Sequence, residues 1–255
     1  NLGNEIAGAV SMLRKLGRWL LWIVLSGVAL QLFFVLKVLG MRWNDPQSTA
    51  FERSEAWRLV TMPNQSLVWK QQWIAYEQIP DHMKRAVIAS EDGDFAFHDG
   101  VEWDAIEKAW RRNSQAEQVA QRRSTRTGKV IPHKIVGGST ITQQLAKNLF
   151  LSGERTMLRK GQEFVITLAL ELFLPKERIL EIYLNSVELG QGVFGVEAAS
   201  WHYYRKSASK LSAYEAARLA VMLPRPKFFE KTPNSPYLAS RAQTIVARMP
   251  DAELP

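Results

Sequence analysis

A long apolar segment near the N-terminus constrains the fold of this chain more than any other feature. Leu20–Leu39 runs for 20 residues with a single charged side chain, close to its end. A helix of that length rises about 30 Å, the thickness of a membrane's hydrocarbon core. Trp19 and Trp22 stand at one end and Trp43 at the other, as is typical of membrane interfaces. The segment predicts a transmembrane helix over 19–40 rather than a buried core helix, and it is too long for a signal peptide.

Basic residues flank the apolar segment unequally. Arg14, Lys15 and Arg18 precede it, whereas Lys37 and Arg42 lie near its other end. The positive-inside rule therefore favours a cytoplasmic N-terminus, with the rest of the chain outside the cytoplasm. The expected layout is a cytoplasmic N-terminus over 1–18, a transmembrane helix over 19–40, a membrane-proximal segment over 41–74 and one domain over 75–255.

Composition narrows the possible chemistry of that domain. The 255 residues include no cysteine, which excludes a disulfide scaffold, an iron–sulfur site and a cysteine nucleophile. The four histidines do not have the spacing of metal ligands. Charged residues make up 23% of the chain and hydrophobic residues 46%, so wholesale disorder is also excluded.

The pattern of apolar residues after the anchor is helical and shows no sustained alternation, which predicts an all-α fold. Residues 46–80 read as a linker, although Trp69, Trp73 and Tyr76 have the spacing of one helix face. Trp103, Ile106 and Trp110 repeat the helical period. Start signals predict helices that begin at Pro80, Thr140, Thr156, Pro175, Ser212 and Ser235. The helix from Thr156 to Phe173 is so apolar that we expect it to be central and mostly buried.

A basic segment interrupts this pattern. Lys108–Lys134 contains eight basic residues and one acid, Glu117, and thus carries most of the net charge of +8. We expect residues 113–136 to form a long surface loop, either solvated or in contact with anionic lipid or substrate. Nucleic-acid binding is not expected, because no motif of a nucleic-acid-binding fold accompanies the charge.

Three polar motifs on apolar elements carry the functional signal. Glu91 and Asp92 end one helix, and a carboxylate beside an apolar cleft is suited to acid–base chemistry, although such pairs are more often simply solvated. The glycines at 137–138 precede a helix start, where free N–H groups favour anions. Arg159 and Glu163 share one face of an apolar helix, where a buried carboxylate needs a partner or a role.

These motifs, with two more, resemble the signatures of the peptidoglycan glycosyltransferases, glycosyltransferase family 51. The first match is 91–100, the second 138–148 and the third Arg159-Lys160-x-x-Glu163. The fourth is 176–199 and the fifth 211–226, so five ordered motifs span about residues 75–228. The basic segment looks longer than is usual between the first two motifs. One anchor followed by this domain alone resembles the family's monofunctional members, which lack a transpeptidase.

The resemblance implies a lysozyme-like α-helical fold and a defined reaction. Members polymerise lipid II, and the expected partners are lipid II, the growing lipid-linked glycan, membrane lipids and other cell-wall synthesis or division proteins. Glu91 would be the general base that takes a proton from the 4-hydroxyl of the incoming sugar. That oxygen would attack the anomeric carbon of the growing chain with inversion and release undecaprenyl diphosphate. The expected location is the bacterial inner membrane, with the catalytic domain in the periplasm.

The resemblance also assigns residues around the leaving diphosphate. Glu163 would be the second essential carboxylate, and it would either hold the neighbouring cations or bind a divalent metal, magnesium or manganese. No organic cofactor is expected. The substrate-binding residues would be Ser139, Gln143, Gln144, Lys147, Arg155, Arg159 and Lys160. The supporting residues would be Asp92, Phe95, His98 and Asn185.

Two other functions remain open at this point. A lytic enzyme of the same fold would cleave finished glycan with carboxylates and water. It has no diphosphate to bind, so the basic residues Lys147, Arg155, Arg159 and Lys160 would lack a role. A non-catalytic membrane-anchored scaffold is the second alternative, and the intact carboxylates argue against it.

Overall fold

The protein is described by a computed structural model that covers residues 2–62, 68–103, 107, 111–112, 114–117, 119–120, 138–151, 153–154 and 156–255. The chain divides into two compact units, Asn1–Asn44 and Asp45–Pro255. The first unit is built on one long helix, and the second contains every other element.

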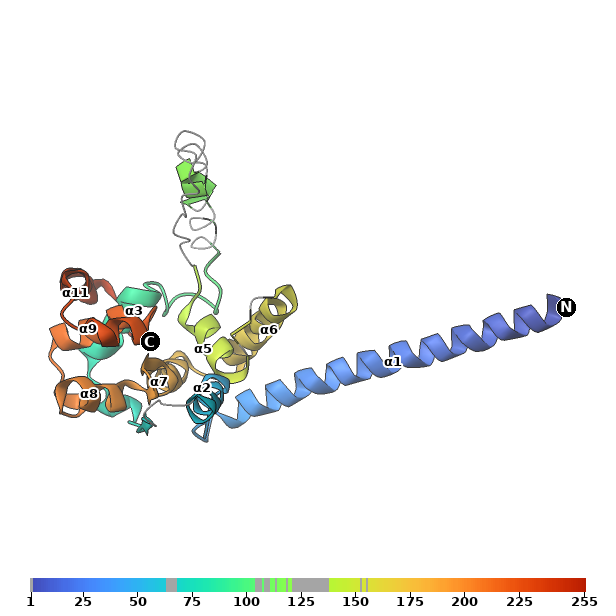
Figure 1. Ribbon diagram of the computed structural model, residues 1–255, viewed down its shortest axis with the longest axis horizontal. Coiled ribbons are helices and arrows are strands. Elements are labelled where there is room, and N and C mark those ends of the chain that lie inside the picture. Colours follow the sequence, from blue (N-terminus) through green and yellow to red (C-terminus); the bar gives the residue numbers. More distant parts are fainter. Residues whose placement is uncertain are drawn as a thin grey trace. The chain divides into compact units, whose positions relative to one another are not determined.

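Helix α1, Leu2–Gly40, forms the first unit (Figure 1). Its stretch Met12–Gly40 reaches a mean hydropathy of 2.3, and none of its most apolar window is buried. It is the one helix among the described residues that is long and apolar enough to cross a membrane. This confirms the apolar helix expected over 19–40 and contradicts the alternative of a buried core helix.

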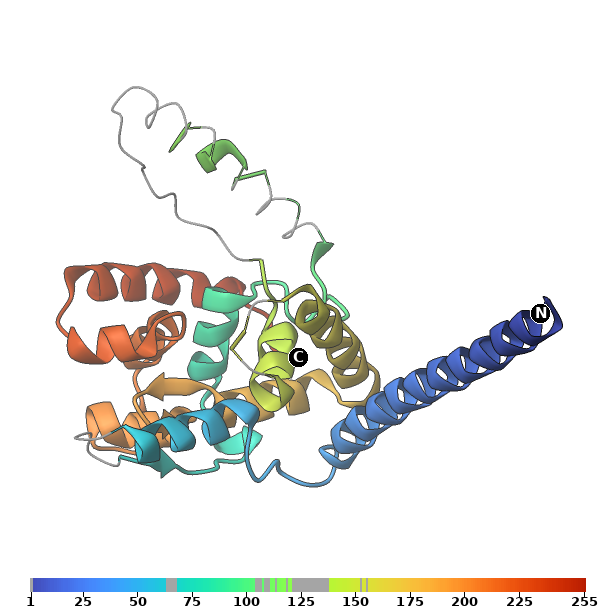
Figure 2. The ribbon, with the colours of Figure 1, turned by 45° about the vertical axis from the view of Figure 1, so that its right-hand side comes forward.

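Helices dominate the second unit, as the all-α prediction requires. Helix α3 lies between the C-terminal helices and α5, and α6 follows beyond α5 (Figures 1 and 2). The helices of this unit are α2 (Ala50–Thr61), α3 (Asp81–Glu91), α5 (Ile141–Phe150), α6 (Met157–Phe173), α7 (Lys176–Ser186), α8 (Val196–Tyr204), α9 (Ala213–Met222), α10 (Pro226–Lys231) and α11 (Pro236–Arg248). Short 3-10 turns cover Tyr76–Gln78, Ala208–Lys210 and Met249–Asp251.

The predicted helix starts are confirmed. Pro80 and Pro175 are the N-cap residues of α3 and α7, and Thr156 caps α6. Thr140 and Ser212 each form a complete capping box, in which the side chain accepts from the backbone three residues on. Such capping residues predict helix starts well, because their side chains accept from backbone N–H groups that have no partner inside the helix.

A small three-stranded sheet corrects the reading of residues 69–76 as one helix face. Strand β1, Lys70–Gln71, pairs parallel with β3, Val193–Phe194, and β2, Glu188–Gly190, pairs antiparallel with β3. The aromatic side chains of this segment instead contact different residues. The Trp69 ring lies 5.1 Å from that of Phe194, and the Arg178 guanidinium lies 5.5 Å from the Trp73 ring.

Helix α2 corrects the linker expected over 46–80. Thr49 and Glu52 form a capping box, a signal that sequence reasoning overlooked. Glu52 is buried, and its second oxygen accepts from Gln71 Nε2 at 2.8 Å, which ties α2 to β1. Burial raises the pKa of Glu52, although a hydrogen bond from the Thr49 backbone and the charge of Arg53 lower it in part. Residues from Asp45 onward therefore belong to the compact unit.

The basic segment is helical where it is described, at 111–112, 114–117 and 119–120. The loop expected from residue 113 is therefore wrong for 114–117 and 119–120, where glutamine, alanine and glutamate are good helix formers that need no apolar stripe on an exposed surface. Residues 121–137 lie outside the described part, as do Ile106 and Trp110.

Helix α6 is less buried than expected. One face carries the buried residues Glu163, Ile166, Thr167, Ala169 and Leu170. The opposite face exposes Phe164, Val165, Leu168 and Leu172, with Leu172 75% exposed. Apolar composition alone does not distinguish a helix surrounded by protein from one with a second apolar face that is exposed.

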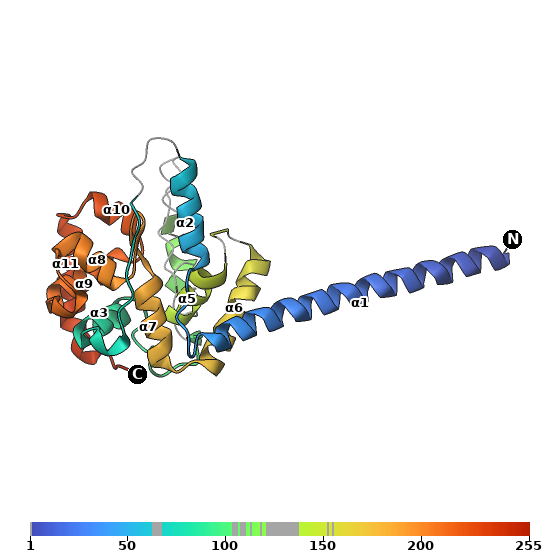
Figure 3. The same ribbon diagram turned by 90° about the horizontal axis from the view of Figure 1, so that it is seen from below.

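Two groups of helices meet at the carboxyl end of α3. Helix α3 packs against α9 and α11, whereas α5 packs against α6, α7 and α2 (Figures 1 and 3). A hydrogen bond from Gln144 on α5 to Glu91 on α3 links the two groups. The first and second motifs are therefore neighbours in space.

Candidate active site

Glu91 is the last residue of α3 and is partly buried. Its Oε2 accepts a hydrogen bond from Gln144 Nε2 at 3.0 Å, and its Oε1 accepts one from Ser90 Oγ at 3.3 Å. Burial raises the pKa of Glu91, although these two hydrogen bonds and the charge of Lys147 oppose the rise. The carboxylate is held by neutral donors and is not ion-paired among the described residues, so it can exchange a proton.

Gln144 is itself fixed by Tyr183, a residue that sequence reasoning does not place in the site. Tyr183 on α7 is fully buried, and its hydroxyl donates to Gln144 Oε1 at 2.9 Å. Burial, with the nearby charges of Glu91 and Asp92, raises the pKa of Tyr183 well above its ordinary value. The only sequence signal was its place in the fourth motif.

Asp92 faces away from the Glu91 contacts and joins two motifs. Its Oδ2 accepts from the backbone N–H of Ile141 at 2.9 Å, and its Oδ1 accepts from His98 Nε2 at 2.8 Å. The other His98 nitrogen accepts from the backbone N–H of Gly100 at 3.0 Å, so the neutral ring carries its proton on Nε2. These bonds fasten the loop after α3 to the start of α5.

Gly100 closes that loop in a conformation that only glycine adopts easily. Its φ is +83°, and a Cβ there would lie 2.8 Å from side-chain atoms of Thr167 and Glu171. Its carbonyl accepts from Thr140 Oγ1 at 2.7 Å. Phe95 is fully buried under the Lys176 ammonium, which lies 4.5 Å from its ring. Phe95, like His98, therefore shapes the site.

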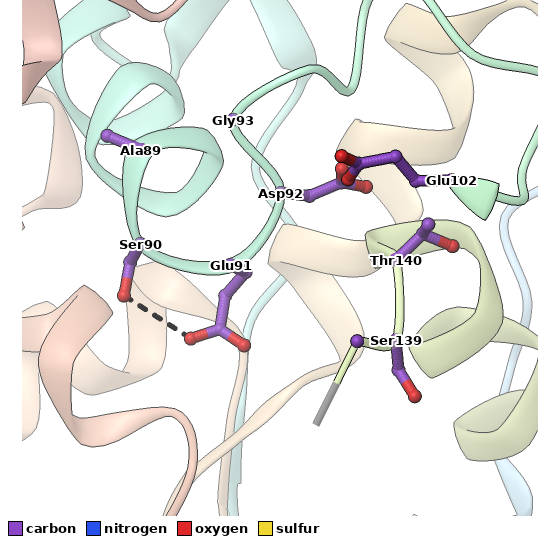
Figure 4. A pocket seen from close by; sticks show the side chains of 9 residues that line it. Ala89, Ser90, Glu91, Asp92, Gly93, Glu102, Ser139 and Thr140 are labelled. Atoms are coloured by element: carbon purple, nitrogen blue, oxygen red, sulfur yellow. Dashed lines mark hydrogen bonds between the residues drawn. The ribbon is translucent and has the colours of Figure 1, made fainter. Parts of the chain in front are cut away.

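A pocket of about 180 Å³ opens beside Glu91. In Figure 4, Glu91 lies on the α3 side of this pocket, and Ser139 and Thr140 lie on the α5 side. Glu102 also lines it and was missed, because no pattern marks an isolated acid that follows a glycine turn. The remaining lining residues are Ala89, Ser90, Asp92, Gly93 and Gly138.

Glu163 occupies a different environment on α6. Its side chain is 4% exposed, and its two oxygens accept from Arg159 Nη1 at 3.0 Å and Lys160 Nζ at 2.5 Å. The Arg159 Nε is buried with no hydrogen-bond partner among the described residues. The third motif therefore forms one cluster of two cations and one carboxylate, on a helix that packs against α5.

The other predicted site residues do not gather in one place. The Lys147 ammonium lies 5.7 Å from the Phe51 ring and acts on Glu91 through its charge. The side-chain oxygen of Gln143 accepts from the backbone N–H of Thr140 in the α5 capping box. Asn185 is buried with three hydrogen bonds, two of them to the backbone of Ile74. Arg155 lies outside the described residues.

A divalent metal at Glu163 does not fit this arrangement. Both carboxylate oxygens already accept from cations, which would repel a metal ion. The described residues also contain no cluster of three histidine, aspartate or glutamate side chains that could hold one. Metal binding is one of the two roles that the resemblance leaves open for Glu163, and no chemical step below passes through a metal.

A helical unit with a carboxylate of raised pKa beside a polar pocket, and a cation cluster on another helix, is typical of an enzyme that uses general acid–base chemistry. The sequence profile described as "Transglycosylase" matches residues 60–250. The chain belongs to the transglycosylase family.

Named relatives agree over nearly the whole chain. A biosynthetic peptidoglycan transglycosylase of Burkholderia thailandensis is 50% identical over 95% of this chain and 90% of its own length. One of Herminiimonas arsenicoxydans is 48% identical over 96% of this chain and 100% of its own. One of Bordetella pertussis is 48% identical, with 91% of each chain covered.

Proposed function

We propose that this protein polymerises lipid II into linear glycan strands by inverting glycosyl transfer and releases undecaprenyl diphosphate. The relatives above are named for peptidoglycan transglycosylation, and the five motifs occur in family order. The observation that carries the proposal is Glu91, a carboxylate at a pocket with its pKa raised by burial and with neutral hydrogen-bond donors.

Glu91 acts as the general base. Its ionised carboxylate accepts the proton of the attacking sugar hydroxyl as the new carbon–oxygen bond forms and the bond to the diphosphate breaks. A neutral hydroxyl is a weak nucleophile, so loss of its proton during attack lowers the barrier. The raised pKa makes Glu91 a stronger base than an exposed carboxylate.

Negative charge that develops on the leaving diphosphate requires cations. Arg159 and Lys160 supply two, and Lys147 on α5 supplies a third. Glu163 accepts from the first two and limits their freedom, so that less reorganisation is needed when the diphosphate departs. This assigns Glu163 the role of positioning cations, one of the two that the resemblance leaves open.

A lipid-linked substrate is consistent with both units. Helix α1 has the length and hydropathy of a single membrane span. In the second unit, α6 exposes an apolar face about one turn away from the cation cluster. The same helix can therefore contact the lipid with its apolar face and the diphosphate with its cations. We place the N-terminus in the cytoplasm and the second unit in the periplasm of the inner membrane.

That orientation has a direct test. The chain has no cysteine, so single cysteines introduced at exposed positions can be labelled without background. A membrane-impermeant thiol reagent added to intact spheroplasts should label Tyr237→Cys in the second unit and leave Arg14→Cys unlabelled. The reverse pattern would overturn the orientation.

The activity is tested with purified full-length protein and labelled lipid II. Wild type should make long glycan, and Glu91→Gln should make none while keeping its circular dichroism spectrum. Shortened fragments from finished cell wall would favour a lytic enzyme. A folded Glu91→Gln protein that fully restores function in cells would favour a scaffold.

A further inference from the structure

We infer that Tyr183 is a positioning residue for the general base, acting through the side-chain amide of Gln144. The inference rests on the proposed function of Glu91 and adds a residue to which no role in the reaction is otherwise given. The chain of contacts runs from Tyr183 Oη to Gln144 Oε1 at 2.9 Å, and from Gln144 Nε2 to Glu91 Oε2 at 3.0 Å.

The first step is the orientation of the Gln144 amide. A glutamine amide can present either its oxygen or its N–H groups, and the two orientations have nearly the same shape. Only the N–H orientation favours an ionised carboxylate. The oxygen orientation would face Glu91 with a second acceptor, which requires Glu91 to be protonated.

Tyr183 selects between these orientations. Its hydroxyl is fully buried, and Gln144 Oε1 is the one acceptor found for it among the described residues. If the amide turned over, the hydroxyl hydrogen would lose that acceptor inside the protein, and a buried polar group without a partner is unfavourable. The phenol itself stays neutral, because burial raises its pKa well above the ordinary value.

Other groups around Glu91 also affect its pKa or line its pocket. Asp92 follows it on the chain and raises its pKa, whereas Lys147 on α5 lowers it. Glu102 lines the same pocket. From α9, the uncharged Ala220 carbonyl accepts from the Ser90 hydroxyl at 3.5 Å. None of these groups can replace Tyr183 in fixing the amide.

Removal of the hydroxyl should therefore act on the pH dependence of the reaction. In Tyr183→Phe the Gln144 amide is free to turn, so donation to Glu91 weakens and its pKa rises further. The acid limb of kcat/KM, which reports the free enzyme, should move up by about 0.5–1 pH unit. At alkaline pH, kcat/KM should stay close to that of the wild type.

A matched control is available in Tyr203. Its hydroxyl also donates to one internal oxygen, the Leu189 carbonyl, at 2.7 Å, and burial raises its pKa in the same direction. Tyr203→Phe loses an equivalent hydrogen bond but should leave the acid limb in place. Gln144→Leu should move the limb as Tyr183→Phe does, and the double variant should show no further movement, because both changes remove one donor from Glu91.

The experiment uses the full-length protein in detergent with two readouts. The first is the pH profile of lipid II polymerisation, and the second is titration of the Glu91 carboxyl by carbon NMR, assigned with Glu91→Gln. Site-specific 3-fluorotyrosine at position 183 gives a variant of nearly native size with a stronger donor, and it should move the titration to lower pH. This variant decides the matter if Tyr183→Phe does not fold.

An unchanged Glu91 titration in both Tyr183 variants would overturn the inference, as would an equal shift in Tyr203→Phe. Absence of polymer from folded wild type would instead overturn the proposed function. In that event the NMR titration still decides whether Tyr183 acts on Glu91.

Discussion

Two glutamates, Glu91 on α3 and Glu163 on α6, lie in opposite electrostatic environments. Glu91 accepts from a neutral amide and a neutral hydroxyl, and burial raises its pKa. Glu163 is 4% exposed and accepts from one arginine and one lysine. A carboxylate that must take up a proton cannot be held by two cations, because they would stabilise the ionised form too strongly. One that must hold two cations in place benefits from them.

The two glutamates also differ in how far along the chain their partners lie. On α6 the cations lie three and four residues before Glu163, on its own helix face, so the pairing is local. On α3 the amide that donates to Glu91 comes from α5, 53 residues later. A local pairing is readable from spacing, whereas a tertiary one is not.

The largest expected effect comes from removing the base. Glu91→Gln keeps the shape of the side chain and abolishes proton uptake, so polymerisation of lipid II should fall by about 10²–10⁴-fold. The measurement is initial rate with labelled lipid II at saturating concentration. Glu102→Gln is the control, because Glu102 lines the same pocket whereas the Gln144 amide donates to Glu91, and this variant should lose far less. Equal losses would break the assignment of Glu91.

A smaller loss should follow from Glu163→Gln. The substitution leaves Arg159 and Lys160 without their carboxylate, and their positions relax, so the rate should fall by about 10–100-fold. Because the cations act on the departing diphosphate, kcat should fall more than KM rises. Arg111, whose exposed partner is Glu107, provides the matched surface pair. Glu107→Gln should leave the rate unchanged, and a loss there would weaken the comparison.

The contrast between local and tertiary pairing also explains which parts of the structure the sequence predicts. Helix starts at Thr140, Thr156 and Ser212 were readable, because each side chain bonds its own backbone within three residues. Helix α2 has the same signal at Thr49, but its apolar residues do not line one buried face, so the helical period is weak.

What was missed depends on tertiary contacts. Strand β1 exists only because β3, more than a hundred residues later, supplies its partner. The exposed apolar face of α6 was missed because composition does not say what covers a surface. Tyr183 was in a recognised motif, but its bond to Gln144 depends on how α7 packs against α5.

Stability should respond to Glu91 in the direction opposite to activity. Its pKa is higher in the folded protein than in the unfolded chain, so the folded state holds the proton more tightly. Stability is therefore greatest below the unfolded pKa and falls as pH rises through the folded value. At pH 7, Glu91→Gln should raise the free energy of unfolding by about 0.5–2 kcal/mol. Below the unfolded pKa the gain should vanish, which thermal unfolding at pH 7 and pH 4 would show.

The smallest effect is expected from chelation, and it separates the two roles left open for Glu163. If Glu163 positions cations, removal of divalent metal by EDTA leaves its partners in place, and the rate should change by less than about twofold. If Glu163 bound a metal, EDTA-treated wild type would fall to the rate of Glu163→Gln, and added magnesium or manganese would restore only the wild type. The comparison must be made between the two proteins, since a metal can also act on the lipid diphosphate in solution. A wild-type loss that Glu163→Gln does not share would show that this carboxylate resembles a metal ligand more than an ion-pair partner.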